Sequence, residues 1–147
     1  MMKKAVPIIV CIIISALLCG CGAKEQNHMA TESGKTATFI NEANDADIWI
    51  LPKTEKNLKT TVWGTATAAA VKKGESRSFE LCEPGDGGMY IFRMIDTDGL
   101  FYSANDIVLQ AGHTLRIKEN DIMSFTLEVA DEKGALQSTY EVFAAKL

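Results

Sequence analysis

The sequence predicts an all-β domain built as two packed antiparallel sheets, and three observations support this prediction. Short stretches rich in β-branched and aromatic residues recur about every ten residues, each ended by Gly, Pro, Asn or Asp. Within the clearest stretches, apolar and polar side chains alternate as half-buried strands require. About eight such strands within roughly 110 residues suit a single sandwich domain.

We expect these strands to form an immunoglobulin-like or transthyretin-like sandwich. The clearest is 122–130, where every second residue from Met123 to Val129 is apolar. The stretch 89–95 is apolar on both faces apart from Arg93, which indicates a central strand covered on two sides. The full set of expected strands is 37–42, 47–51, 77–82, 89–95, 100–103, 106–109, 113–118 and 122–130.

Two regions allow more than one interpretation. Residues 66–70, an alanine-rich run after Trp63-Gly64, suit either an edge strand or a short helix. Near the C-terminus, apolar residues spaced four, three and four positions apart suit a helix. However, the turn-forming segment 131–134 also suits a hairpin loop that leads into a strand at 135–143, and we favour the hairpin.

The first 20 residues have the organisation of an export signal. Lys3 and Lys4 precede an apolar run at 5–18, which small residues follow. A membrane-spanning helix needs about 20 apolar residues, so this run is too short to be one. We expect three parts: a cleaved signal peptide at 1–20, a lipidated N-terminus with a flexible linker at 21–36, and the β-sandwich at 37–147.

Leu18-Cys19-Gly20-Cys21 resembles the lipobox of bacterial lipoproteins, in which an aliphatic residue, a small residue and Gly or Ala precede the modified cysteine. Cys19 is less usual at its position than Ala or Ser. The resemblance implies cleavage between Gly20 and Cys21 and lipid attachment at Cys21, where two acyl chains hold a protein stably on a bilayer. It implies a cell-membrane, extracytoplasmic location without distinguishing the inner from the outer membrane. An ordinary secretory signal is the alternative.

Charge and cysteine content exclude several classes of function. Cleavage after residue 20 leaves 13 Lys and Arg against 19 Asp and Glu, a net charge of −6, which disfavours nucleic-acid binding. The linker is too polar to fold by itself. Cys82 is then the one cysteine besides Cys21, so no disulfide framework is expected, and we predict that Cys82 is a buried structural thiol.

Residues 39–118 also resemble a loosely defined set of uncharacterised bacterial β-sandwich domains. The resemblance implies a sandwich fold and no assigned activity. Its pattern consists of an Asn after the first strand, a Trp-Gly, a Gly-Glu-Ser before a strand, and a Tyr-x-x-Arg-x-x-Asp-x-Asp-Gly hairpin. The matching positions are Asn41, Trp63-Gly64, Gly74-Glu75-Ser76, Tyr90, Arg93, Asp96, Asp98 and Gly99.

Asp96-Thr97-Asp98-Gly99 is the stretch most similar to a metal site. Carboxylates at alternate positions followed by Gly begin many calcium loops. The closing acidic ligand is missing, and Asp-Gly between two strands is typical of a hairpin turn, which we predict here. We predict no metal or other cofactor; the residues available for an ion site are Asp96, Asp98 and Asp106.

No catalytic residue is predicted. His113 is the one histidine beyond the linker, and its pairing with Cys82 matches no nucleophile motif. The preferred hypothesis is a lipid-anchored module that binds an envelope protein or polysaccharide, with an undetermined oligomeric state. The aromatic residues available for contacts are Trp49, Trp63, Tyr90, Phe101 and Tyr102.

Two other hypotheses remain open. The first is a structural envelope component that associates with copies of itself through an open sheet edge. The second is a hydrolase whose catalytic carboxylates are scattered in the sequence. An exposed aromatic strip favours the binding module, a long uncovered edge favours self-association, and two facing carboxylates in a cleft favour the hydrolase.

Overall fold

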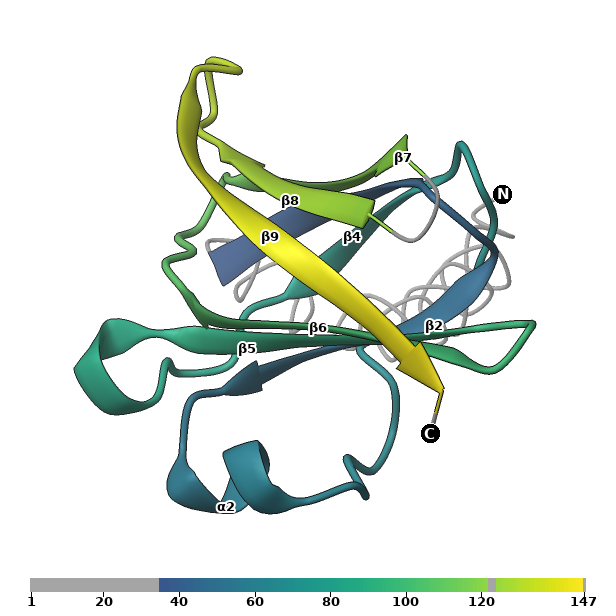
Figure 1. Cartoon of the computed structure of the whole chain (residues 1–147). Coiled ribbons are helices and arrows are strands. Elements are labelled where there is room, and N and C mark those ends of the chain that lie inside the picture. The colour runs from purple at the N-terminus through teal and green to yellow at the C-terminus, as the bar shows by residue number, and fades with distance from the viewer. Residues whose placement is uncertain (1–34, 122–123, 147) are drawn as a thin grey trace, which may run out of the picture. The chain divides into compact units, whose positions relative to one another are not determined.

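The computed structural model describes residues 35–121 and 124–146 (Figure 1). The predicted signal peptide and nearly all of the linker lie outside these residues, as do the predicted cleavage and lipidation positions Gly20 and Cys21. Within the described part of the chain, no helix combines the length and apolar character needed to cross a membrane.

The prediction of an all-β domain is confirmed. Most expected strands lie within one or two residues of their expected positions. The elements are β1 Thr36–Glu42, β2 Ala46–Pro52, α2 Glu55–Lys59, β3 Ala68–Val71, β4 Ser76–Glu80, η2 Asp86–Gly88, β5 Tyr90–Asp96, β6 Leu100–Ile107, β7 Thr114–Asp121, β8 Ser124–Ala130 and β9 Leu136–Lys146.

The nine strands form one continuous hydrogen-bonded sheet in the order β3-β2-β5-β6-β9-β8-β7-β1-β4. The prediction of two separate sheets is not confirmed, because the 11-residue strand β9 belongs to both layers. Its first part, Leu136–Phe143, pairs with β8, and its end, Phe143–Lys146, pairs with β6. Neighbouring strands are antiparallel as expected, except that β1 and β7 are parallel.

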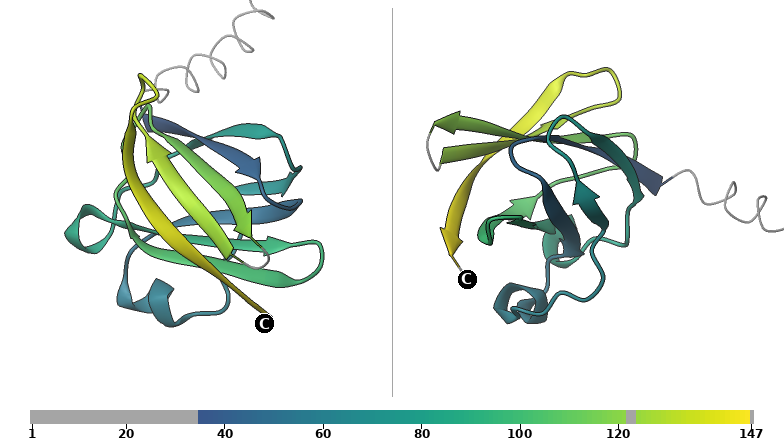
Figure 2. Two further views of the ribbon diagram at one scale, coloured as in Figure 1. Left: turned by 45° about the horizontal axis from the view of Figure 1, so that its top comes forward. Right: turned by 90° about the vertical axis from the view of Figure 1, so that its right-hand side faces the viewer.

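The sheet curls until it is nearly a barrel. Figures 1 and 2 show the yellow strand β9 crossing obliquely from the layer that contains β8 to the layer that contains β6. The two edge strands, β3 and β4, follow each other in the chain and are joined by the turn at 72–75. A single core fills the space between the two layers.

Aromatic contacts join the two layers within the core. Phe39 of β1 stacks on Phe92 of β5 with ring centroids 6.0 Å apart, and Tyr102 of β6 meets Phe125 of β8 edge to face at 4.6 Å. Each large apolar side chain buried in this way contributes about 1.5–3 kcal/mol relative to its exposed state. Other buried core residues are Ile48, Met94, Leu115, Ile117, Leu127 and Val129.

The structure resolves the ambiguous regions and corrects one boundary. The run at 66–70 leads into the edge strand β3, and the hairpin at 131–134 is confirmed, with Gly134 at φ 81°. The strands expected at 100–103 and 106–109 form a single strand, β6. Its pairing with β5 shifts register between Tyr90 and Phe92, opposite the polar residues that interrupt the apolar pattern.

Candidate functional site

The face of β2, β5 and β6 that points away from the core carries the candidate site, and we call it the outer face. Side chains alternate along a strand, so Phe92 and Met94 in the core leave Arg93 on the opposite side. The strand register places Trp49 and Ser103 on either side of Arg93 in one row.

Trp63, which lies outside the strands, completes an aromatic cluster on this face. Trp63, from the β2–β3 crossover at 53–67, stacks on Phe101 with ring centroids 5.2 Å apart and an interplanar angle of 14°. Trp63 also meets Trp49 edge to face at 5.4 Å. All three side chains are half-buried. We call Trp49, Trp63 and Phe101 the aromatic cluster.

The aromatic cluster holds the crossover against the sheet. Trp49 Nε1 donates to the carbonyl oxygen of Gly64 over 3.1 Å, and Trp63 Nε1 donates to that of Thr60 over 3.0 Å. The short helix α2 is capped by Thr54 but buries no side chain. Val62, beside Trp63, is 79% exposed. The crossover therefore lies on the outer face with little apolar contact from its own helix.

Arg93 lies beneath this cluster and is only 6% exposed. Its Nη1 donates to the carbonyl oxygens of Phe92 and Ala104, at 2.8 and 3.3 Å, and to Oδ1 of Asn105 at 2.9 Å. The guanidinium carbon lies 6.0 Å from the centroid of the Phe101 ring.

No ion pair links Arg93 to a carboxylate among residues 35–121 and 124–146. Burial lowers the pKa of Arg93 from its ordinary value, but an arginine still stays protonated at neutral pH. Within the described part of the chain, the outer face thus contains a buried cation whose contacts are neutral acceptors and an aromatic ring.

The sequence identified the aromatic candidates but did not assign Arg93 to a site. The structure brings together Trp49, Trp63 and Phe101, whereas Tyr90 and Tyr102 are 3% and 0% exposed and belong to the core. A signal for Arg93 was present, because it is a single charge within a strand that is apolar on both faces. Most of its partners come from the neighbouring strand β6, which the local pattern around Arg93 does not reveal.

The three aspartates considered for an ion site are not brought together. Asp96 is buried, and its Oδ1 accepts hydrogen bonds from the backbone nitrogens of Asp98 and Leu100, so it closes the predicted β5–β6 turn. Asp106 lies near the other end of β6, about 20 Å along the strand, and forms an ion pair with Lys53. Within the part of the chain that the structure describes, no three acidic, His or Cys residues form a metal-binding group.

Cys82 and His113 lie on opposite sides of β1, because Cys82 follows β4 and His113 precedes β7. The prediction that Cys82 is buried is wrong: its position beyond the end of β4 leaves it exposed. Partial burial of the sulfur still raises the pKa of the Cys82 thiol. His113 Nδ1 accepts a hydrogen bond of 3.3 Å from the backbone nitrogen of Gln110.

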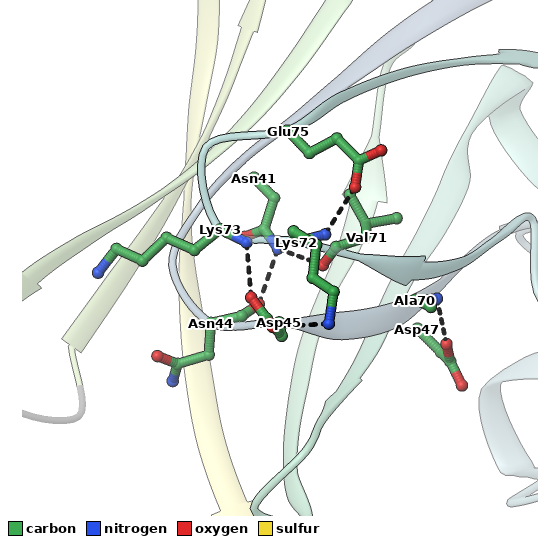
Figure 3. A network of polar contacts seen from close by, with 9 residues as sticks. All are labelled: Asn41, Asn44, Asp45, Asp47, Ala70, Val71, Lys72, Lys73 and Glu75. Atoms are coloured by element: carbon green, nitrogen blue, oxygen red, sulfur yellow. Dashed lines mark hydrogen bonds and ion pairs between the residues drawn. The ribbon is translucent and has the colours of Figure 1, made fainter.

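Asn41, the first residue of the family-like pattern, organises the corner between β1, β2 and β3 (Figure 3). Its buried Nδ2 donates to the carbonyl oxygens of Asn44 and Val71, at 2.7 and 3.0 Å. Its Oδ1 accepts from the backbone nitrogen of Ala43. Asn41 therefore has a structural role in this chain, and it lies within β1 rather than after it.

Charged groups extend this corner towards the β3–β4 turn (Figure 3). Asp45 accepts from the backbone nitrogen of Lys73 at 2.8 Å and pairs with Nζ of Lys72 at 3.1 Å. These contacts lower the pKa of Asp45, the Lys73 hydrogen bond most strongly. The Arg77 side chain, and then the Lys72 backbone N–H, lower the pKa of Glu75.

A hollow of about 520 Å³ lies between the loop before β7 and the β8–β9 hairpin. His113 and Tyr140 line it together with Asp131. The Asp131 carboxylate accepts from the backbone nitrogens of Lys133 and Ala135 and from Nε2 of Gln137, so it stabilises its own hairpin. The carboxylate that lines this hollow therefore already has hydrogen-bond partners within its own hairpin.

Comparisons with known proteins give no relative from which a function can be transferred. No protein-family model, curated protein or solved structure matches the chain. The functional interpretation therefore depends on the chemistry of the outer face and on the sequence of the N-terminal segment.

Proposed function

We propose that the chain is a bacterial lipoprotein whose β-domain is an extracytoplasmic binding or accessory module for an envelope protein or polymer. The lipobox-like sequence that ends at Cys21 supports the anchor, and the polar segment at 21–36 supports a flexible tether. The domain then remains on its membrane and reaches outward from it.

The observation that carries the binding function is the aromatic cluster above Arg93. Binding sites are typically lined by aromatic side chains with a few well-placed polar groups. Trp and Arg are also the residues most often found at the energetic centres of interfaces. The outer face has this composition and lies outside the core that holds the two layers together.

For the architecture, we propose that the curled sheet is a variant of the immunoglobulin-like or transthyretin-like sandwich. The Phe39–Phe92 and Tyr102–Phe125 contacts between the layers support a sandwich-like core. The long strand β9 then closes one side of a sandwich that would otherwise be open.

The edge strands do not favour self-association over binding. Strand β3 has four residues and β4 has five, and β4 carries Arg77 and Glu80. Short and charged edges are features that limit edge-to-edge pairing.

Photo-crosslinking in intact cells tests the binding function. A photoreactive amino acid replaces Val62, which is 79% exposed beside the aromatic cluster, or Phe143, which is 70% exposed on β9, in the full-length protein. We expect a discrete crosslinked partner from position 62 and none from position 143. Crosslinks of equal yield at both positions, or none at either, would contradict the proposal.

A further inference from the structure

We propose that Arg93 recognises a carboxylate on the ligand and that the ligand is a saccharide with one acidic group at the bound unit. This inference rests on the proposed binding function and specifies its chemistry. It assigns the carboxylate to the guanidinium and the sugar ring to the aromatic cluster.

The hydrogen bonds of Arg93 leave one side of its guanidinium available. All three acceptors within the described residues bond to Nη1, whereas Nε and Nη2 donate to none of those residues. Nε and Nη2 together form a two-pronged donor that matches the two oxygens of a carboxylate.

The surroundings of Arg93 also favour an anion from outside the chain. A buried charge is costly unless it is paired, and a carbonyl oxygen or an aromatic face compensates it only in part. The nearby carboxylates are engaged elsewhere: Asp106 pairs with Lys53, and Asp47 accepts from the backbone nitrogen of Ala70 over 2.7 Å. A ligand carboxylate would therefore supply the missing counter-charge.

The aromatic cluster and the net charge define the rest of the ligand. Flat indole and phenyl rings offer a surface on which the C–H face of a pyranose ring can pack. The predicted mature chain has a net charge of −6, which opposes a polyanion such as a nucleic acid. One carboxylate per bound sugar unit satisfies Arg93 without accumulating this repulsion.

Within the described residues, Nε and Nη2 of Arg93 are not among the fully buried side-chain atoms that lack a hydrogen-bond partner, so this edge of the guanidinium keeps contact with solvent. Trp63 stacks on Phe101, whose ring lies beside the guanidinium, so a ligand bound at this edge changes the environment of Trp63.

Tryptophan fluorescence measures binding at this site directly. The chain has two Trp residues, Trp49 and Trp63, and both belong to the aromatic cluster. The full lipid-anchored protein, in detergent micelles, is titrated with cellobiouronic acid, its methyl ester and cellobiose. We expect the acid to bind at least tenfold more tightly than the other two sugars. Equal affinity for acid and ester, or no response to the acid, would overturn the inference.

Substitution of Arg93 tests the role of the guanidinium. We expect Arg93→Gln to lose at least tenfold in affinity for the acid but to bind the ester as the parent protein does. The matched control Arg116→Gln, a half-exposed position on β7, should bind both sugars like the parent. Thermal unfolding checks that each variant folds; if Arg93→Gln does not, the comparison of acid and ester on the parent protein decides.

The outcomes separate this inference from the proposed function. If Arg93→Gln captures the same crosslinked partner from position 62 at an unchanged level, the carboxylate inference fails and the binding function stands. If triglutamate binds the parent protein tightly while cellobiouronic acid does not, the ligand is an acidic peptide, and the saccharide inference fails. If no partner is captured at all, both fail.

Discussion

Oη of Tyr102 donates a hydrogen bond of 2.8 Å to Oδ2 of Asp96, which ties the middle of the hairpin strand β6 to the end of β5. The same Oδ2 accepts from Nδ2 of Asn44 at 3.2 Å, so the contact also reaches the β1–β2 corner. Both Asp96 and Tyr102 are buried. An aspartate that resembles a metal ligand in the sequence thus serves as a structural anchor.

We expect Asp96→Ala to lower the free energy of unfolding by about 2–4 kcal/mol, since it leaves several buried donors without an acceptor. Asp98→Ala, in the exposed part of the same turn, should change it by less than about 0.5 kcal/mol. Urea denaturation measures both. Similar effects for the two substitutions would show that Asp96 is not the anchor.

The same pair predicts a loss of stability in alkali. Burial, and then the hydrogen bond to Asp96, raise the pKa of Tyr102 above its ordinary value. The unfolded chain ionises this phenol near pH 10, whereas the folded chain keeps it neutral, so stability falls as pH rises above about 10. Unfolding free energies measured between pH 8 and 11 should show a smaller slope in Tyr102→Phe. An unchanged slope would contradict this assignment.

Asp45 and Glu75 predict a loss of stability in acid. Their pKa values are lowered in the folded protein, so their stabilising contribution is present above the unfolded values near pH 4 and is lost as pH falls through the folded values. We expect Asp45→Asn and Glu75→Gln to be less sensitive to acid than the parent protein between pH 5 and 2. If both variants follow the parent's acid denaturation curve, the corner network does not contribute.

Cys82 should react with thiol reagents in the folded protein because it is exposed. Its raised pKa leaves less thiolate than a free cysteine at neutral pH, so the reaction should be slow at pH 7 and accelerate above pH 9. Titration with Ellman's reagent should find one thiol per mature chain if Cys21 is acylated. Reaction only after denaturation would show that Cys82 is shielded.

Incorporation of radiolabelled palmitate tests the lipid anchor. The parent protein and Cys19→Ser should both incorporate label, because we place the modification at Cys21 and the cysteine before it is not the acceptor. Cys21→Ser should incorporate none and should be released from the membrane. Label retained in Cys21→Ser would disprove the assignment.

Local patterns in the sequence predicted most of the strands and the final hairpin, because alternation and turn residues act over a few positions. They did not predict the parallel pairing of β1 with β7 or the passage of β9 into a second layer, since both depend on contacts between distant segments. The contacts within the aromatic cluster could not be predicted for the same reason. Trp49, Trp63 and Phe101 are separated in the chain and meet because the crossover folds back over β6. The prediction for Cys82 was wrong because the strand expected at 77–82 ends at Glu80, two residues before the cysteine.

The most direct test of the account is the effect of Trp63→Ala on capture of the crosslinked partner by the membrane-anchored protein, measured beside its unfolding midpoint. Loss of the stacked ring should lower stability by only about 1–2 kcal/mol, since Trp63 is half-buried outside the core. We predict that the folded variant captures at least tenfold less partner from position 62. Unchanged capture by a folded Trp63→Ala protein would contradict the claim that the outer face is a recognition surface.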